Sequence, residues 1–155
     1  RAGSMRTKAR LQKLPHAQGL SLPAYESAGA AGADIRAALP DAPLTLAPMA
    51  RTAIPTGLCM SLPDGYEAQI RPRSGLALKQ GLSLVNTPGT IDSDYRGEIK
   101  VIAVNLGDTA IEITHGMRVA QMVIAPVIQA EFYETEILDD TERGSAGFGS
   151  TGTES

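Results

Sequence analysis

Glycine and proline interrupt the apolar stretches of this chain so often that few helices can form. Sixteen glycines and ten prolines are spread over 155 residues. Short apolar runs lie between them at residues 50–62, 66–70, 98–105, 110–114 and 119–127. Within residues 67–71 the polar side chains take every second position, which is the period of a half-buried strand. Many short strands with little helix predict an all-β sandwich or barrel.

One helical turn is expected at residues 74–80, where Ser74 is placed to cap the first turn and Gly81 to end the last. The length fits a single domain with a core large enough to fold without crosslinks. We expect this β domain to cover residues 5–133. Residues 1–4, which precede Met5, are expected to be a cloning remnant outside the domain.

Composition restricts the partners and the compartment. A net charge of −3 and a pI near 5.4 argue against a protein that coats nucleic acid. No apolar stretch reaches the roughly 18 residues of a membrane span. The single cysteine, Cys59, excludes an internal disulfide, is expected in the core, and fits a reducing cytoplasm. No zinc-site spacing is present, and His16 and His115 are expected to be isolated and exposed.

Residues 86–97 form the segment with the clearest chemical character. Pro88 and Gly89 open it, Gly97 closes it, and apolar runs at residues 82–85 and 98–104 flank it, which predicts a β-hairpin. Asp92 and Tyr95 lie three residues apart on its rim. They are suited to line a pocket, with the ring as a wall and the carboxylate facing a reacting atom. The alternative is an acidic surface hairpin whose tyrosine packs on the sheet.

Residues 134–155 differ from the rest of the chain. They are first acidic, then rich in glycine, serine and threonine, and they lack periodicity, so we expect a flexible arm. At roughly 3.3 Å per residue, about twenty residues span on the order of 65 Å, enough to reach a neighbouring subunit. Arg143 and Phe148 suit a lid that closes over a phosphate and a base. The alternative is an ordinary frayed terminus.

Five segments together carry a family resemblance. Along the chain they are AGADI at residues 31–35, RPRSGLA at 71–77, the 86–97 segment, RVAQM at 118–122 and RGSAGFGSTG at 143–152. In this order and spacing they resemble the five motifs of the trimeric dUTP diphosphatases (dUTPases), from about residue 10 to residue 152. The resemblance implies a jelly-roll-like β-clip fold and hydrolysis of dUTP to dUMP and pyrophosphate. That reaction limits uracil incorporation into DNA and supplies dUMP for thymidylate synthesis.

The resemblance also implies roles for residues near the phosphates. Arg73, Ser74, Gly75 and Gln121 would bind the phosphate chain. Mg²⁺ is the implied cofactor, held mainly by phosphates and water, with Asp34 touching it through water. Simpler structural roles remain open: a helix cap beside a surface arginine at Arg73 and Ser74, a structural hydrogen bond for Gln121, and a turn fixed by Asp34.

The remaining implied roles concern the chemistry, the base and the arm. Asp92 would deprotonate the water that attacks the α-phosphorus, and Tyr95 would exclude a 2′-hydroxyl. Asn86 and nearby backbone groups would recognise uracil. The resemblance assigns further substrate contacts to the arm, at Arg143, Phe148, Gly149, Ser150 and Thr151.

Threefold assembly is likewise an implication of the resemblance. Each site of the homotrimer would combine residues from all three chains. One chain would supply Asp34, Arg73, Ser74 and Gln121, a second Asn86, Asp92 and Tyr95, and a third Arg143 and Phe148.

The chain departs from the family pattern at two positions, and three other functions are alternatives for such a sequence. Ile35 replaces a usual leucine and Ala146 a common glycine. The rivals are a dCTP deaminase, a non-enzymatic dUTPase-like binding module and a plain structural β-domain. The first needs a glutamate base that no segment here provides, the second should lack a catalytic element, and the third leaves the arm unexplained.

Overall fold

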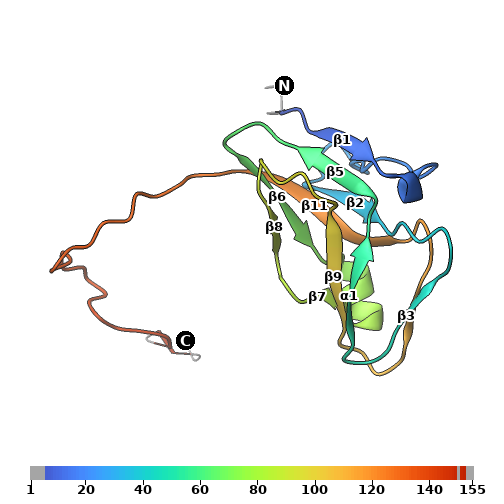
Figure 1. Ribbon diagram of the computed structural model, residues 1–155. Helices are drawn as coiled ribbons and strands as arrows, with labels where there is room; N and C mark the ends of the chain where they lie inside the picture. The colour runs from blue at the N-terminus through green and yellow to red at the C-terminus, as the bar shows by residue number, and fades with distance from the viewer. Residues whose placement is uncertain (1–5, 150, 153–155) are drawn as a thin grey trace.

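A computed structural model describes residues 6–149, 151 and 152 as a β body followed by a long arm (Figure 1). The strands and helices, with their bounds, are β1 (Arg10–Lys13), η1 (Pro15–Ala17), β2 (Gly32–Arg36), β3 (Leu44–Leu46), β4 (Arg51–Pro55), β5 (Leu58–Ser61), β6 (Tyr66–Arg71), α1 (Ser74–Gln80), β7 (Leu82–Leu84), β8 (Gly89–Ile91), β9 (Lys100–Asn105), β10 (Ile111–Ile113) and β11 (Arg118–Pro126). The prediction of an all-β fold with one short helix is confirmed.

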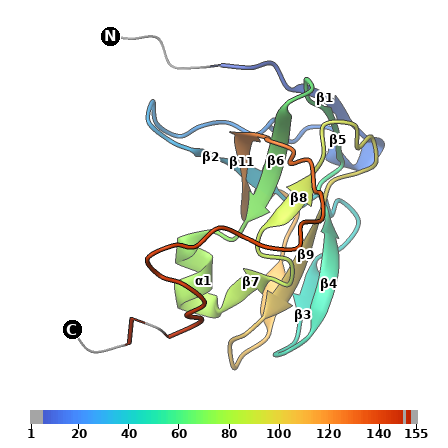
Figure 2. The ribbon, with the colours of Figure 1, turned by 90° about the vertical axis from the view of Figure 1, so that its left-hand side faces the viewer.

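The strands form four antiparallel sheets within the described residues. The largest has the order β2-β11-β6-β8, and a second has the order β4-β9-β7. Two-stranded sheets pair β1 with β5 and β10 with β3. Most neighbours in these sheets are distant in sequence, as in a jelly-roll-like fold. Figure 2 shows helix α1 at the end of the body opposite β1.

One hydrophobic core joins the sheets. β6 shows the predicted alternation, since Ala68 and Ile70 are buried while Gln69 is half-buried and Arg71 exposed. Ile35, one of the two residues that depart from the family pattern, is completely buried in this core. The core side chains come from both larger sheets and include Ile54, Leu82, Val101, Val119 and Met122.

The core also contains a polar residue that ties neighbouring strands together. Asn105 is fully buried, and its side-chain amide donates to the carbonyl oxygens of Leu46 and Thr109 at 2.9 and 2.8 Å. Its side-chain oxygen accepts from the Gly107 N–H at 2.9 Å. Because these hydrogen bonds replace those lost to water, burial of this amide does not leave it unsatisfied.

Of the two predicted ends of helix α1, the C-terminal end is confirmed and the N-terminal cap is not. Gly81 ends it as expected, in the left-handed conformation with φ 73° that glycine adopts without strain. The predicted cap at Ser74 is wrong, because Arg73 occupies the N-cap position and no side chain makes a capping hydrogen bond. Ser74 is instead the first helical residue, with an exposed side chain.

The predicted hairpin around residues 86–97 is confirmed, with an addition. β7 and β9 pair in antiparallel register, with Leu82 opposite Asn105 and Leu84 opposite Ala103. The connection between them also contains β8, which pairs with β6 of the other large sheet. The connecting segment is therefore held by two sheets rather than forming a free loop.

Two expectations about single residues were wrong. His16 is not isolated, because its Nε2 lies 2.7 Å from the Glu98 carboxylate. Cys59 is only half-buried, since it faces outward on β5 between the buried Leu58 and Met60. His115 is exposed as expected, but its Nδ1 accepts a hydrogen bond from the Leu39 N–H.

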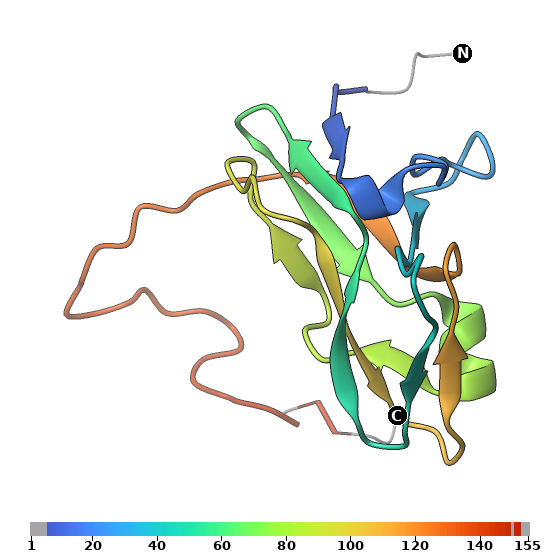
Figure 3. The ribbon, with the colours of Figure 1, turned by 45° about the vertical axis from the view of Figure 1, so that its right-hand side comes forward.

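The chain leaves the body after β11, which ends at Pro126. The Val127 N–H donates to the Gly65 carbonyl oxygen, and no strand or helix occurs in residues 127–149. Figures 1 and 3 both show this segment running clear of the sheets. Several large apolar side chains on it are exposed, including Ile128, Phe132, Tyr133 and Ile137.

Within the described part of the chain, no helix combines the length and apolar character needed to cross a membrane.

Candidate active site

A cluster of charged side chains lies where β2, β11 and the start of α1 meet. The Asp34 carboxylate lies between two guanidinium groups, with Arg73 Nε at 3.0 Å and Arg118 Nη1 at 3.3 Å. Arg73 also donates to the Arg118 carbonyl oxygen at 3.2 Å. The side chain of Asp34 is 17% exposed and that of Arg73 30%, so water screens this cluster less than it would a surface ion pair. Arg73 is thereby fixed at the helix N-terminus, a place that favours anions.

Gln121 lies on β11 beside this cluster. In the sheet register it is opposite Asp34 on one side and Arg71 on the other. Its side-chain nitrogen donates to the Pro72 carbonyl oxygen at 2.9 Å. This bond gives the amide the hydrogen-bond partner that it needs in an apolar strand. A cavity of about 460 Å³ opens next to it, lined by Gln69, Arg71, Pro72, Thr87, Pro88 and Gln121.

Gly32 is a site-forming residue that the sequence interpretation missed. A Cβ atom at position 32 would lie 2.1 Å from Gln121 Oε1, too close for any real contact. The absence of a side chain therefore lets the Gln121 amide lie against β2. A glycine inside a strand is a signal of such close approach, so the sequence did contain a hint.

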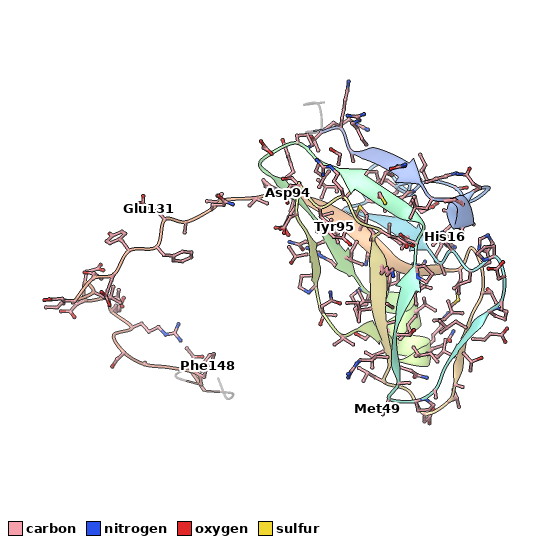
Figure 4. The ribbon with its side chains drawn as sticks, viewed as in Figure 1. His16, Met49, Asp94, Tyr95, Glu131 and Phe148 are labelled. Carbon is pink, nitrogen blue, oxygen red and sulfur yellow. The ribbon has the colours of Figure 1, made fainter. Side chains whose placement is uncertain are left out.

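The 86–97 segment presents Asp92 and Tyr95 at the surface of the body. Asp92 is exposed, and no described residue donates a hydrogen bond to its carboxylate. Tyr95 is 44% exposed, and its hydroxyl donates to the Glu98 carbonyl oxygen at 3.0 Å. Gly97 makes this arrangement possible, because a Cβ there would lie 2.5 Å from the Tyr95 hydroxyl oxygen. Figure 4 shows Tyr95 and its neighbour Asp94 on the body.

Asn86 lies just before β8. Its side chain is exposed, and its Nδ2 would lie 3.1 Å from a Cβ placed on Gly89. The amide thus occupies the space that a side chain at Gly89 would need, and no described residue hydrogen-bonds to it, so its donor and acceptor are both available to a ligand.

The end of this segment is anchored by Glu98. Its carboxylate oxygen Oε2 accepts from His16 Nε2 at 2.7 Å and from the Gly57 N–H at 3.0 Å. Burial by itself raises the pKa of Glu98, but the His16 and Gly57 hydrogen bonds outweigh burial and hold that pKa below its ordinary value. Glu98 therefore stays ionised and links the 86–97 segment to η1 and to the turn before β5.

The arm residues lie apart from the rest of the candidate site. Phe148 is completely exposed, and Figure 4 shows it on the arm away from the body. Among the described residues, the Arg143 guanidinium donates only to the Gly147 carbonyl oxygen, at 3.5 Å. Gly149 and Thr151 are exposed as well, and Ser150 lies outside the described residues.

The structure brings some of the predicted residues together within one chain and leaves others apart. Asp34, Arg73 and Gln121 form one group, to which Ser74 and Gly75 at the start of α1 belong. Asn86, Asp92 and Tyr95 form a second group on one segment, and the arm residues form a third. No ion pair or hydrogen bond links the side chains of one group to those of another among the described residues.

The donor set suits a metal that relies on few protein ligands. No group of three or more histidine, cysteine, aspartate or glutamate side chains in the described part of the chain is arranged to hold a metal. Asp34 offers one carboxylate, whose two oxygens each keep a lone pair beyond the arginine contacts. Such a site fits Mg²⁺, which keeps most of its water and binds through one or two carboxylates plus phosphates. It does not fit a metal that needs a full protein cage.

Comparisons with known proteins agree with this geometry. A family model described as dUTPase matches residues 19–152. The deoxyuridine 5'-triphosphate nucleotidohydrolase of Roseobacter denitrificans is 70% identical over 131 residues, covering 84% of this chain and 86% of that protein. The protein of the same name from Beijerinckia indica is 60% identical over 143 residues, covering 92% and 89%.

Solved structures show the same fold. A variant of the Staphylococcus bacteriophage 80alpha dUTPase with dUpNHpp superposes with a TM-score of 0.83 at 25% identity, covering 94% of this chain and 98% of that one. A variant of the dUTPase from phage phi11 of S. aureus, described with a structural Mg(II) ion, gives a TM-score of 0.73 at 23% identity, covering 84% and 97%. Taken with the family model, these findings confirm the resemblance seen in the sequence. The chain belongs to the dUTPase family.

Proposed function

We propose that this chain hydrolyses dUTP to dUMP and pyrophosphate. The observation that carries the proposal is the group formed by Asp34, Arg73 and Gln121, which fixes a guanidinium fork and an amide side by side at a helix N-terminus. Such a group suits a polyphosphate, because the guanidinium matches two phosphate oxygens at once. Membership of the dUTPase family identifies the nucleotide. In a cell this reaction would limit uracil in DNA and supply dUMP for thymidylate synthesis.

Asp92 is the proposed general base. Its exposed carboxylate, free of hydrogen bonds from other described residues, is available to take a proton from a water molecule. A positioned base of this kind contributes typically 10²–10⁴-fold. The water would then attack the α-phosphorus, and pyrophosphate would leave from the opposite side.

Asn86 and Tyr95 are the proposed selectivity residues. The Asn86 amide presents a donor and an acceptor, the pair that the edge of uracil requires. The Tyr95 ring is held against Gly97 by its hydroxyl bond to Glu98, so it cannot easily turn away. A ring fixed in this way would pack on the deoxyribose and leave no space for a 2′-hydroxyl.

Charge neutralisation is assigned to the cationic side chains and to Mg²⁺. Arg73 would bind phosphate oxygens, with Ser74 and Gly75 adding groups from the start of α1. Asp34 would hold Mg²⁺ through water, and the ion, when bound, would supply positive charge for the phosphate oxygens. Asp34 also keeps Arg73 in place, so its carboxylate serves the phosphate site in two ways.

The arm and the assembly complete the proposed site. Arg143 would bind the terminal phosphates, Phe148 would stack on uracil, and Gly149, Ser150 and Thr151 would add backbone and hydroxyl contacts. Since these groups do not meet within one chain, we propose a homotrimer in which each site takes the phosphate group, the 86–97 segment and the arm from three different chains. The exposed apolar side chains that follow β11, such as Ile128, Phe132 and Tyr133, support this, because burial against a neighbour would remove them from water. On this proposal, residues 134–155 act as the closing arm, and residues 127–133, which follow the last strand, connect it to the body.

The test is direct. Incubation of the full chain with dUTP and Mg²⁺ should release pyrophosphate and dUMP in equal amounts, whereas dTTP, dCTP and UTP should react far more slowly. An Asp92→Asn chain prepared in the same way controls for contaminating hydrolases. Release of ammonia from dCTP would identify a deaminase instead, and binding of dUTP without turnover would identify a binding module.

A further inference from the structure

Arg71 is a cation of the 71–77 segment to which the proposed mechanism gives no role. It is the last residue of β6, it is exposed, and its register partner in β11 is Gln121. Directly opposed residues of an antiparallel pair project from the same face of the sheet. Arg71 therefore shares a face with Gln121 and, one strand further, with Asp34. It also lines the cavity that opens beside Gln121.

The charge of Arg71 is not balanced by a neighbouring acid. Arg73 and Arg118 share the Asp34 carboxylate, and Arg118 is also 4.0 Å from a Glu26 oxygen. No carboxylate of the described residues lies within ion-pair distance of Arg71. Arg71 therefore has no acidic partner among the described residues, whereas Arg73 and Arg118 both do.

Gln69 holds the Arg71 side chain in place. Its Oε1 accepts from Arg71 Nε at 3.1 Å and also from Nη2. A guanidinium has five N–H donors, so three remain for another acceptor. Because the group is already oriented by Gln69, less side-chain entropy is lost when a ligand binds it.

We propose that Arg71 is an additional phosphate ligand, which contacts the phosphate chain of the bound nucleotide beside Gln121, with Gln69 as its positioning residue. This inference rests on the proposed function, since it assumes that a nucleotide phosphate chain lies at Gln121. An uncompensated guanidinium with free donors on the wall of an open cavity is suited to capture phosphate oxygens. A contact of this kind would strengthen binding of the phosphates without touching the base.

The experiment compares Arg71→Gln and Arg71→Lys with a matched control, Arg51→Gln. Arg51 is also an exposed arginine at the end of a strand, but it belongs to the β4-β9-β7 sheet. Binding of the non-hydrolysable analogue α,β-imido-dUTP and of deoxyuridine is measured by titration calorimetry with Mg²⁺. We expect Arg71→Gln to weaken binding of the analogue about tenfold, as for the loss of a charged hydrogen bond, and to leave deoxyuridine binding unchanged. Arg51→Gln should change neither.

Two further results are expected. Arg71→Lys should bind the analogue with intermediate affinity, because it keeps the charge but loses the fork. Raising the salt to about 1 M should shrink the difference between wild type and Arg71→Gln, because an exposed ionic contact is screened.

Gln69 is tested by a double-mutant cycle. Gln69→Ala should weaken analogue binding about threefold in the wild-type background and have no further effect when Arg71 is already glutamine. A purely structural role of Gln69 would give the same loss in both backgrounds and would contradict its assignment as a positioning residue.

The outcomes separate the inference from the proposed function. If wild type fails to bind α,β-imido-dUTP, the proposed function itself is wrong. If wild type binds and Arg71→Gln binds equally well, only the role of Arg71 is overturned. Equal losses for the analogue and deoxyuridine, or a lower oligomer mass for Arg71→Gln, would show that Arg71 supports the structure and would overturn the inference as well.

Discussion

Replacing Gly32 with alanine perturbs the orientation of one side chain while changing little else. The new Cβ would lie 2.1 Å from Gln121 Oε1 and 3.0 Å from its Cδ, so the amide has to move. Moving it breaks the 2.9 Å hydrogen bond from Gln121 to the Pro72 carbonyl oxygen. The backbone at Gly32 does not have a positive φ, so alanine itself introduces no backbone strain.

The two expected effects differ in size. For stability, the lost hydrogen bond costs about 0.5–1.5 kcal/mol. Reduced entropy of the unfolded chain returns about 0.4–1 kcal/mol, so the net change should stay near or below about 1 kcal/mol. For catalysis, a displaced Gln121 would lose its proposed hydrogen bond to a charged phosphate. Such a bond is worth about 1.5–3 kcal/mol, which corresponds to a loss of roughly 10–150-fold.

The assay pairs urea unfolding with steady-state hydrolysis of dUTP. Gly29→Ala serves as the matched control, because Gly29 also lacks a positive φ and nothing lies within 4 Å of a Cβ placed there. Gly29→Ala should keep full turnover and unfold at the same or a slightly higher urea concentration. If Gly32→Ala retained the turnover of Gly29→Ala, the orientation of Gln121 would not matter for catalysis and the reasoning would be refuted.

Three further predictions follow from the site and its surroundings. Because the folded-state pKa of Glu98 is depressed, its contribution to stability is present above its ordinary value of 4.5 and is lost as the pH falls through the folded value. Glu98→Gln should therefore flatten the acid side of a plot of urea midpoint against pH, and unchanged slopes would contradict this. Tyr95→Ala should raise the turnover of UTP relative to dUTP, and a constant ratio would place sugar discrimination elsewhere. Deleting the chain from Arg143 onward should leave the thermal midpoint of the body within about 2 °C of wild type while hydrolysis falls steeply, because none of the described residues in that segment belongs to the core.

Much of the fold could be predicted from the sequence because its signals are local. The alternation in residues 67–71 places Ala68 and Ile70 in the core, and Gly81 ends the helix at the expected residue. The cap at Ser74 failed because the chain enters α1 from the extended Arg73, whose side chain is drawn away to Asp34. That contact joins residues far apart in sequence, and local propensity carries no information about it.

The same distinction applies to the candidate site. Its residue types were found from five short segments, but their grouping depends on strand register. Gln121 lies between Asp34 and Arg71 only because β11 pairs with both β2 and β6. The hydrogen bond between His16 and Glu98 joins residues 82 positions apart, so no local signal in the sequence indicated that these two side chains would pair.

Co-refolding two inactive chains tests the central proposal, a dUTP-hydrolysing site built from three chains, most directly. Asp92→Asn chains keep the arm, and arm-deleted chains keep Asp92, so each alone should be nearly inactive. The two are then unfolded, mixed in equal amounts and refolded. In a random cyclic trimer, about one quarter of the sites should combine Asp92 from an arm-deleted chain with the arm of an Asp92→Asn chain. We therefore expect about a quarter of wild-type hydrolysis to return, because half of the chains carry Asp92 and the other half carry the arm. If each chain carried a complete site, mixing would restore no activity, and that result would contradict the account.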